Sequence, residues 1–235
     1  DQKRFRLVQG NFRDIKNLSQ TELVNQKFTG VLFDLGVSSL QLGSPERGFS
    51  FDKVGPLDMR MDPTLSVRAI DLIKILSRKE LHELFTSLGQ EKLSWPIADS
   101  LVRAREIEGN REQFTVYSTK DLANLVEGVY KKYKVKSKIH PGTKVFQALR
   151  MAVNSELEAL EDALPQALEV TRSYGNICAI SFHSLEDGKV KRTFKEWERR
   201  GLGSVLTKKP ITPGVLEISQ NPRSRSANLR IFRKK

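Results

Sequence analysis

The chain has 235 residues, of which 38% are hydrophobic and 29% charged, a composition typical of globular proteins and unlike collagen-like or disordered chains. A single cysteine, Cys178, excludes a disulfide framework within the chain and a cysteine-based zinc site, and three histidines argue against a His-rich metal centre, so we expect no metal. The 40 Lys and Arg residues outnumber the 28 Asp and Glu residues, and the net charge of +12 favours a polyanionic partner such as nucleic acid. A solvated basic surface without such a partner is the alternative.

The first part of the chain predicts two strands. Alternating apolar residues from Phe5 to Val8 indicate a short strand before a turn at Gly10. The apolar run from Gly30 ends in Asp34 and a Gly-containing turn, which is typical of a buried parallel strand. Because open α/β sheets bind ligands beyond the carboxyl ends of their strands, Asp34 is a candidate site residue. Its alternative role is that of a turn former or helix cap.

A loop and a helical block follow. Residues 43–63 are dense in Gly, Pro, Asp and Arg, which predicts an irregular binding or active-site loop, and their Phe and Met residues favour partial packing over disorder. Residues 66–133 carry Leu and Phe at helical spacings, with capping boxes at Ser77 and Ser118. Gly89 and Gly109 mark helix ends, and Pro96 breaks or starts a helix. We expect an all-helical insertion.

Five lysines within residues 131–138 close this block. Such a cluster is a candidate contact for phosphates of a nucleic acid. A solvated loop with no partner is an equally reasonable interpretation, because exposed lysine runs are common.

The last part of the chain predicts the rest of an α/β sheet. A long helix is expected from Lys144 to Leu168, kinked or ended by Pro165. The strand Asn176–Ser181 then leads to His183 and Glu186 at its carboxyl end, again at the chemical edge of such a sheet. A structural histidine and first-turn helix carboxylates are the alternatives. A further helix around Phe194 and a basic turn into a last strand complete the pattern.

Several sequence blocks together resemble the RsmH (MraW) family. They occur in the family's order over nearly the whole chain, and they are Asp34–Ser39, Glu46–Ser50, Gly55–Asp62, Phe146–Arg150 with Val153–Leu157, Ser181–Asp187 and Asn221–Ser226. The family consists of S-adenosylmethionine-dependent methyltransferases that modify N4 of a cytidine in small-subunit ribosomal RNA. The sequence shows no Walker A loop, dinucleotide-binding glycine motif, zinc-protease motif or hydrolase elbow that would favour another class.

The resemblance implies an α/β fold, a class I (Rossmann-like) methyltransferase sheet interrupted by a helical domain. The implied domains are a first methyltransferase part at residues 1–65, a helical RNA-recognition insertion at 66–138 and a second methyltransferase part at 139–235. The family's Gly-Gly-His turn after its first strand has no counterpart here. We therefore expect a chain that lacks the first strands and that by itself binds cofactor poorly and is inactive.

The resemblance also implies site residues. Phe12, Asp34 and Gln41 correspond to contacts of the S-adenosylmethionine cofactor. Candidate catalytic residues are Asp58, His183 and Glu186. The candidate substrate-binding residues are all basic, and they are Arg60, Lys131, Lys132, Lys134, Lys136 and Lys138.

The expected partners are the small ribosomal subunit and its rRNA, without a membrane, and a homodimer is compatible with the sequence. The expected location is the bacterial cytoplasm, or the mitochondrial matrix for a eukaryotic source. Two other functions fit the same residues: a non-catalytic RNA-binding or ribosome-assembly factor, and a methyltransferase that acts on DNA or protein.

Overall fold

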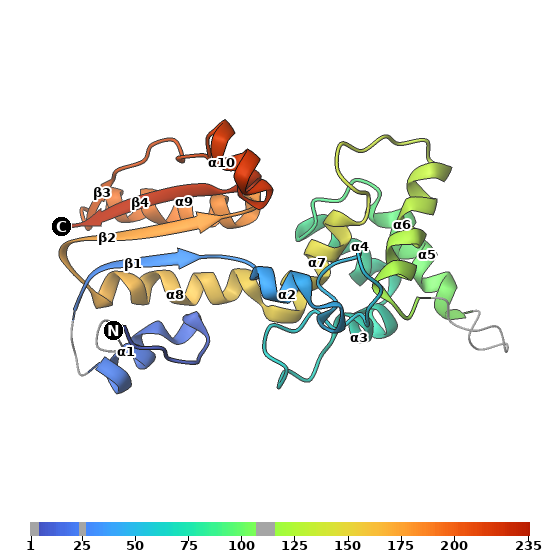
Figure 1. The fold of residues 1–235 in the computed structure, drawn as a ribbon, viewed down its shortest axis with the longest axis horizontal. Helices are drawn as coiled ribbons and strands as arrows, with labels where there is room; N and C mark the ends of the chain where they lie inside the picture. The colour runs from blue at the N-terminus through green and yellow to red at the C-terminus, as the bar shows by residue number, and fades with distance from the viewer. Residues whose placement is uncertain (1–4, 24–26, 107–115) are drawn as a thin grey trace. The chain divides into compact units, whose positions relative to one another are not determined.

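The computed structural model describes residues 5–23, 27–106 and 116–235, which divide into two compact units (Figure 1). The first unit comprises Asp1–Gly36 and Glu156–Lys235, and the second comprises Val37–Ser155. The chain thus leaves the first unit once and returns to it, as expected for a domain with an insertion. None of the described helices is long and apolar enough to cross a membrane.

The first unit contains a four-stranded mixed sheet in the order β1-β2-β4-β3. The strands are β1 (Phe28–Asp34), β2 (Thr171–Ser181), β3 (Gly203–Val205) and β4 (Asn228–Lys234). β1 runs parallel to β2, whereas β4 is antiparallel to both β2 and β3. The parallel pair confirms the two strands predicted around Gly30 and Asn176, and β4 confirms the predicted last strand.

Two long helices cover one face of this sheet: α8 (Glu156–Val170) and α9 (Ser184–Arg199). Phe33 of β1, Ile177 of β2 and Phe232 of β4 point to this face, where they join a core that includes Leu164 of α8 and Phe194 of α9. Residues of alternate register point to the other face, and Leu32 there is 63% exposed. The described helices therefore bury one face of the sheet only.

Shorter elements complete the first unit. They are η1 (Phe12–Asp14), α1 (Ile15–Leu23), α10 (Val215–Gln220) and η4 (Pro222–Ser226). η1 and α1 pack against α8, and Figure 1 shows them beside that helix. Residues 5–9 have no regular structure, so the strand predicted there is wrong. An alternating apolar pattern forms a strand only when a neighbour pairs with it, and the described sheet offers these residues none.

The predicted long helix from 144 to 168 is two helices. α7 (Thr143–Asn154) ends at Ser155, which has a left-handed φ of 47°, and α8 begins at the next residue. Apolar residues continue at helical spacing across the break, so the pattern hides it. Pro165 lies inside α8 and does not end it.

The second unit consists of helices and one long loop. The helices are α2 (Ser39–Gly43), η2 (Pro45–Arg47), α3 (Ala69–Ile75), α4 (Arg78–Ser87), α5 (Ser94–Glu106), α6 (Thr119–Lys132) and α7. The capping boxes at Ser77 and Ser118 are both present, and Pro96 lies in the first turn of α5. The end predicted at Gly109 lies outside the described residues.

This unit is wider than the insertion predicted at 66–138. Its core contains Phe49 and Leu57 from the preceding loop and Leu149 from α7, together with residues of the predicted helices such as Phe85 and Leu122. Burial of these apolar side chains in one cluster ties the loop and α7 to the helices. The boundaries of the unit therefore follow the shared core and not the change in sequence character.

The loop of residues 44–63 is irregular but closely packed. Gly48 has a φ of 69°, and a Cβ added there would overlap the backbone of Pro56. A Cβ at Gly55 would overlap the carbonyl of Pro45. The Gly55 N–H also donates to Thr119 Oγ1 at 3.1 Å, which ties the loop to the start of α6. Glycine is thus required where two backbone segments approach each other.

We predict that Gly55→Ala destabilises the protein by at least about 2 kcal/mol, because the loop backbone must move to admit a methyl group. Gly128→Ala provides a matched control: Gly128 lies in α6 with nothing within 4 Å of an added Cβ. This change should stabilise the protein by about 0.5–1 kcal/mol through helix propensity. Urea unfolding measures the free energy of unfolding of both variants. Equal values for the two would contradict the close packing of residues 44–63.

Candidate functional site

The parallel strands β1 and β2 end at the same edge of the sheet. Asp34, the last residue of β1, lies opposite Ile180 of β2, and His183 follows two residues after β2 ends. The Asp34 side chain is exposed, and no described residue hydrogen-bonds to it. Ligands of open α/β sheets bind at this edge, so Asp34 and His183 occupy the position where a site is expected.

His183 begins α9 and lies in a cluster of polar side chains. Its Nδ1 accepts a 3.4 Å hydrogen bond from the backbone N–H of Glu186, as the cap of the helix. Its Nε2 lies 3.2 Å from Oε1 of Glu186. Glu186 is only 3% exposed, and its Oε2 accepts the N–H of Phe182 at 3.0 Å. Glu156, at the start of α8, completes a group whose possible ligand atoms all lie within 4.8 Å of one another.

The hydrogen bonds of His183 determine what this cluster can do. Because Nδ1 accepts a backbone N–H, the proton of a neutral ring belongs on Nε2, where it points among the carboxylates. Nε2 is buried and makes no well-aligned hydrogen bond within the described ranges. A histidine and two carboxylates form a set that can bind a cation, but a protonated Nε2 is not a metal ligand. The geometry favours hydrogen bonding and proton transfer instead.

Phe12 lies close to the same edge. Its ring packs edge-on against that of Phe33, with centroids 5.9 Å apart, and Phe33 directly precedes Asp34. Phe12 is 38% exposed, so part of an aromatic surface faces solvent near the end of β1. η1 is fixed by an Arg13–Asp162 ion pair of 2.7 Å. An aromatic ring held in this way can pack against a flat heterocycle.

Gln41 belongs to the second unit, where its side chain is engaged in a capping box. Its Oε1 accepts the N–H of Ser38 at 2.8 Å, and Ser38 Oγ accepts the N–H of Gln41 at 3.2 Å. Asp58, Arg60 and the lysines of the 131–138 segment belong to the same unit. The structure therefore groups Phe12, Asp34, His183 and Glu186 in one unit and the remaining predicted residues in the other.

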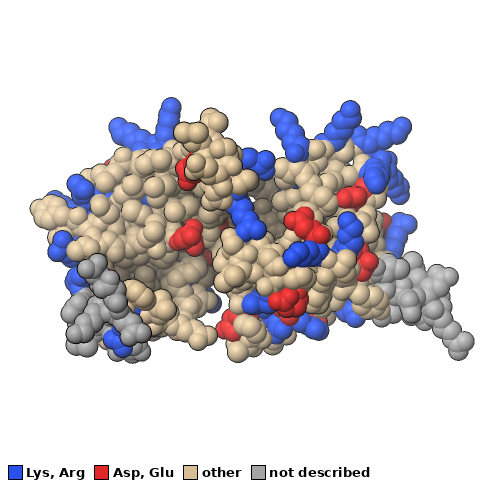
Figure 2. Space-filling model, in the orientation of Figure 1, with Lys and Arg blue, Asp and Glu red and all other residues tan. Residues whose placement is uncertain are grey.

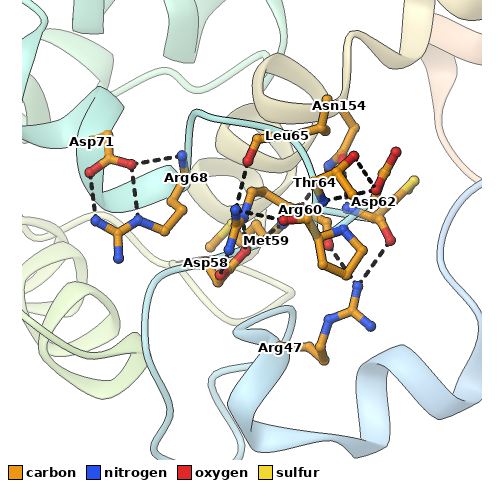
Figure 3. A network of polar contacts seen from close by, with 12 residues as sticks. Arg47, Asp58, Met59, Arg60, Asp62, Thr64, Leu65, Arg68, Asp71 and Asn154 are labelled. Atoms are coloured by element: carbon orange, nitrogen blue, oxygen red, sulfur yellow. Dashed lines mark hydrogen bonds and ion pairs between the residues drawn. The ribbon is translucent and has the colours of Figure 1, made fainter.

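Asp58 and Arg60 form the centre of a polar network (Figure 3). Asp58 accepts hydrogen bonds from Nε and Nη2 of Arg60, each 2.8 Å long. Nη1 of Arg60 donates to the carbonyls of Pro63 at 2.9 Å and Leu65 at 2.6 Å. The hydrogen bond from Arg60 holds the pKa of the Asp58 carboxyl below its usual value. Asp58 is therefore an anion whose oxygens already hold a guanidinium.

Asn154 fixes the backbone of the same loop. Its Nδ2 donates to the carbonyl of Met59 at 2.7 Å, and its Oδ1 accepts the N–H of Met61 at 2.6 Å. Met59 is fully buried with a left-handed φ of 62°, a conformation that costs a non-glycine residue energy. Arg47 donates to the carbonyls of Arg60 and Met61 at 2.7 and 3.0 Å. The side chains of Asn154 and Arg47 thus hold this strained turn, as Figure 3 shows.

The lysine cluster begins in the last turn of α6, continues beyond its end and is exposed. Lys131 lies 3.8 Å from Glu127 in the preceding helical turn. Lys131, Lys134 and Lys136 line a cavity of about 380 Å³ together with apolar surface of Val135 and neighbouring residues. Lys132 and Lys138 are exposed but do not line it.

Two features of the first unit have no local signal in the sequence. Glu156 belongs to the sequence block Val153–Leu157, but it lies near His183 only because α8 and α9 pack on each other. Arg230 of β4 is 5% exposed and donates two hydrogen bonds, of 2.7 and 2.9 Å, to Asp187 at the start of α9. The partners in this ion pair are far apart along the chain, so no spacing rule predicts it.

We predict that Asp58→Asn lowers the free energy of unfolding by about 1 kcal/mol at neutral pH, a modest amount because the Asp58–Arg60 pair is partly exposed. The pKa of Asp58 is lower when folded, so its contribution is present above the unfolded pKa of about 3.9 and is lost as the pH falls through the folded pKa. The wild-type and variant stabilities should therefore converge at acidic pH in urea titrations. Asp52→Asn, on an exposed part of the same loop, is the control. A constant difference at all pH values would contradict the ion pair.

The whole chain, residues 1–235, matches the model of the MraW methylase family. Similar curated proteins carry the name ribosomal RNA small subunit methyltransferase H. The protein of that name from Persephonella marina is 43% identical over 231 residues, which cover 98% of this chain and 76% of the relative. The one from Coprothermobacter proteolyticus is 41% identical over 229 residues, 97% of this chain and 73% of the relative.

A third relative of the same name, from Prochlorococcus marinus subsp. pastoris, is 49% identical over 207 residues, 88% of this chain and 66% of the relative. The mixed sheet, the inserted helical unit and the polar residues at the ends of β1 and β2 agree with these matches. The chain belongs to the MraW methylase family, whose fold is a Rossmann-like methyltransferase.

Proposed function

We propose that the protein transfers a methyl group from S-adenosylmethionine to N4 of a cytidine in small-subunit ribosomal RNA. The observation that carries this proposal is the edge of the sheet where Asp34 and the His183 cluster meet, in a chain of a methylase family. The names of the relatives support rRNA as the substrate class. The compartment is then the one that holds small ribosomal subunits, the bacterial cytoplasm or the mitochondrial matrix.

The residues at this edge fit a nucleoside cofactor. Phe12 offers an exposed aromatic surface for an adenine ring, and Asp34 offers a carboxylate without a described partner for hydrogen-bond donors. Gln41 is the third proposed contact. To reach the cofactor, its side chain must give up its hydrogen bond with the N–H of Ser38 or bind both partners at once. S-adenosylmethionine supplies a methyl group on a sulfonium. The protein has to hold that methyl group in line with the attacking nitrogen.

The chain's own residues must also handle a proton. N4 of cytidine is a weak nucleophile because its lone pair is delocalised into the ring, and it loses a proton as the N–C bond forms and the C–S bond breaks. An oxygen or imidazole that accepts this N–H localises the lone pair and receives the proton. Glu186 is placed for that role, since its carboxylate lies just beyond the end of β2. His183, whose Nδ1 accepts a backbone N–H and whose Nε2 carries the proton, is placed to orient the Glu186 carboxylate. Asp58 is the third candidate, but its oxygens already hold Arg60.

The basic residues of the second unit are proposed to hold the RNA. Lys131, Lys132, Lys134, Lys136 and Lys138 are exposed donors of positive charge suited to phosphates. Arg60 is held by Asp58 and two carbonyls, so its direct role is to maintain the conformation of its loop. We propose that it contributes to substrate binding through that loop. The target base must leave its stack to reach the reacting methyl group, which suits a folded loop of rRNA.

Nucleoside mass spectrometry tests the reaction. Unmodified small ribosomal subunits are incubated with S-adenosylmethionine and the protein with any flanking sequence that its gene encodes. We expect N4-methylcytidine to appear. Glu186→Gln and His183→Gln should lower kcat at least about tenfold, the contribution typical of a positioned acid or base, with little change in cofactor affinity. Asp58→Asn should lower turnover less than Glu186→Gln.

The outcomes separate the competing functions. Cofactor binding without any methylated cytidine would contradict the proposed substrate and favour DNA or protein. RNA binding without cofactor binding would favour a non-catalytic assembly factor. Unchanged turnover in Asp58→Asn would remove Asp58 from the catalytic candidates, and unchanged turnover in both other variants would remove the His183 cluster.

A further inference from the structure

A second basic cavity lies in the first unit, between α9, β3 and β4. It has a volume of about 290 Å³ and is lined by Lys191, Phe194, Lys195, Glu198, Val205, Lys208 and Arg230. One lining residue, Arg230, reaches toward the sheet edge that carries His183, where it is paired with Asp187. The lysines of the cavity lie farther away, along α9 and in the loop after β3. Along α9, Lys195 lies about 18 Å from His183, at a rise of about 1.5 Å per residue. The lysines of the cavity are therefore removed from the proposed reaction site.

The charges around this cavity are not balanced. Lys191 and Lys195 are one helical turn apart on the same face of α9, and Lys208 approaches from the loop after β3. None of the three ammonium groups has a hydrogen bond or ion pair in the part of the chain that the structure describes. Like charges at this spacing repel each other. The protein thus keeps three positive charges around one cavity without a carboxylate bonded to any of them.

The other charged groups of the cavity are already engaged. Arg230 is paired with Asp187 through two hydrogen bonds. Glu198, the one carboxylate in the lining, accepts the backbone N–H of Val205 at 2.8 Å. The side chain of Phe194 is buried, so the floor is apolar. Lys191, Lys195 and Lys208 are all exposed, so an anion can reach them.

We infer that this cavity binds phosphate groups of the ribosomal RNA backbone at a distance from the methylated base. The inference rests on the proposed function for the identity of the anion. A lysine side chain is flexible and recognises mainly the charge of its partner, whereas the planar guanidinium of arginine also recognises geometry. Recognition by charge alone suits the repeating phosphodiesters of an RNA backbone. The volume is at the lower end of the range for small-ligand sites, about 300–1,000 Å³, which suits a phosphate and its sugar better than a whole nucleotide cofactor.

The surface around the cavity is also basic. In Figure 2, Lys and Arg side chains project from the outline of the first unit, while most of its face in view is uncharged. Arg192 of α9 and Arg200, the residue that caps the end of this helix, add charge to that of Lys191 and Lys195. A backbone contact of this kind orients RNA without reading its sequence. The first unit would then hold RNA by itself, in addition to the lysines of the second unit.

The test is a triple substitution, Lys191→Gln, Lys195→Gln and Lys208→Gln, in the protein with its native flanking sequence. Equilibrium binding to unmodified small ribosomal subunits is measured at several salt concentrations. We expect the triple variant to bind about tenfold more weakly near 0.15 M salt. In a plot of the logarithm of the association constant against the logarithm of the salt concentration, its slope should be smaller in magnitude by about 2 to 3. Each phosphate contact contributes about 0.7–0.9 to that slope. The corresponding Lys→Arg triple variant should restore the wild-type slope.

The matched control is Lys79→Gln, Lys92→Gln and Lys120→Gln, which removes the same charge from three exposed side chains outside both basic cavities. Its slope should stay at the wild-type value. Equal slopes for the two Gln triple variants would overturn the inference. So would a cavity variant that loses affinity for inorganic phosphate but binds subunits like the wild type, which would identify a small-anion site.

The same samples separate this inference from the proposed reaction. If the wild type binds subunits but produces no N4-methylcytidine, the proposed reaction fails while the slopes still decide the role of the cavity. If methylation proceeds and the slopes are equal, the reaction stands and the cavity has no role in RNA binding. Unchanged urea midpoints of the variants confirm that folding is not the cause.

Discussion

The parallel pairing of β1 with β2 is the constraint on which the candidate site depends. It sets Asp34 opposite Ile180, so the ends of two strands that are far apart in the sequence meet at one edge. α9 starts immediately beyond that edge with His183 as its cap, and α8 packs against α9 so that Glu156 reaches the same place. Without this register, the polar residues after the two strands would not share a surface.

A second, independent constraint shapes the loop of residues 44–63. Asn154 holds the strained turn at Met59 through hydrogen bonds with the Met59 carbonyl and the Met61 N–H. Arg60 donates hydrogen bonds to Asp58 and to two carbonyls. Polar groups that are buried or half-buried must find partners, and here side chains supply them where regular structure does not. The acidic and basic residues that make this loop look catalytic therefore also have a structural task.

Much of this architecture could be predicted from local patterns. Apolar runs ending in Asp34 and Ser181 gave the parallel strands, and the capping boxes at Ser77 and Ser118 gave two helix starts. The break at Ser155 could not be found this way, because a single left-handed residue leaves the apolar spacing intact. The strand expected near Phe5 failed for a related reason: a strand needs a partner, which local pattern does not supply.

In the site, too, some residues are placed by the strand next to them in the sequence, and others by packing between segments far apart in the sequence. Asp34 ends one strand, and His183 and Glu186 follow another, so their place at the edge can be predicted from the sequence. Glu156 joins them only through helix packing, and the contact of Arg230 with Asp187 depends on the antiparallel course of β4. The lysines of α9 look like an ordinary solvated helix face until β3 and β4 close a cavity around them.

The claim that the carboxyl edge of the β1–β2 pair holds the methyl donor is most directly tested by photochemical cross-linking. Radiolabelled S-adenosylmethionine is irradiated with the protein in its native flanking sequence, and the labelled peptides are identified by mass spectrometry. The account predicts saturable label on peptides that contain Phe12, Asp34 or residues 182–187. Saturable label confined to peptides from α3 to α6 would contradict it.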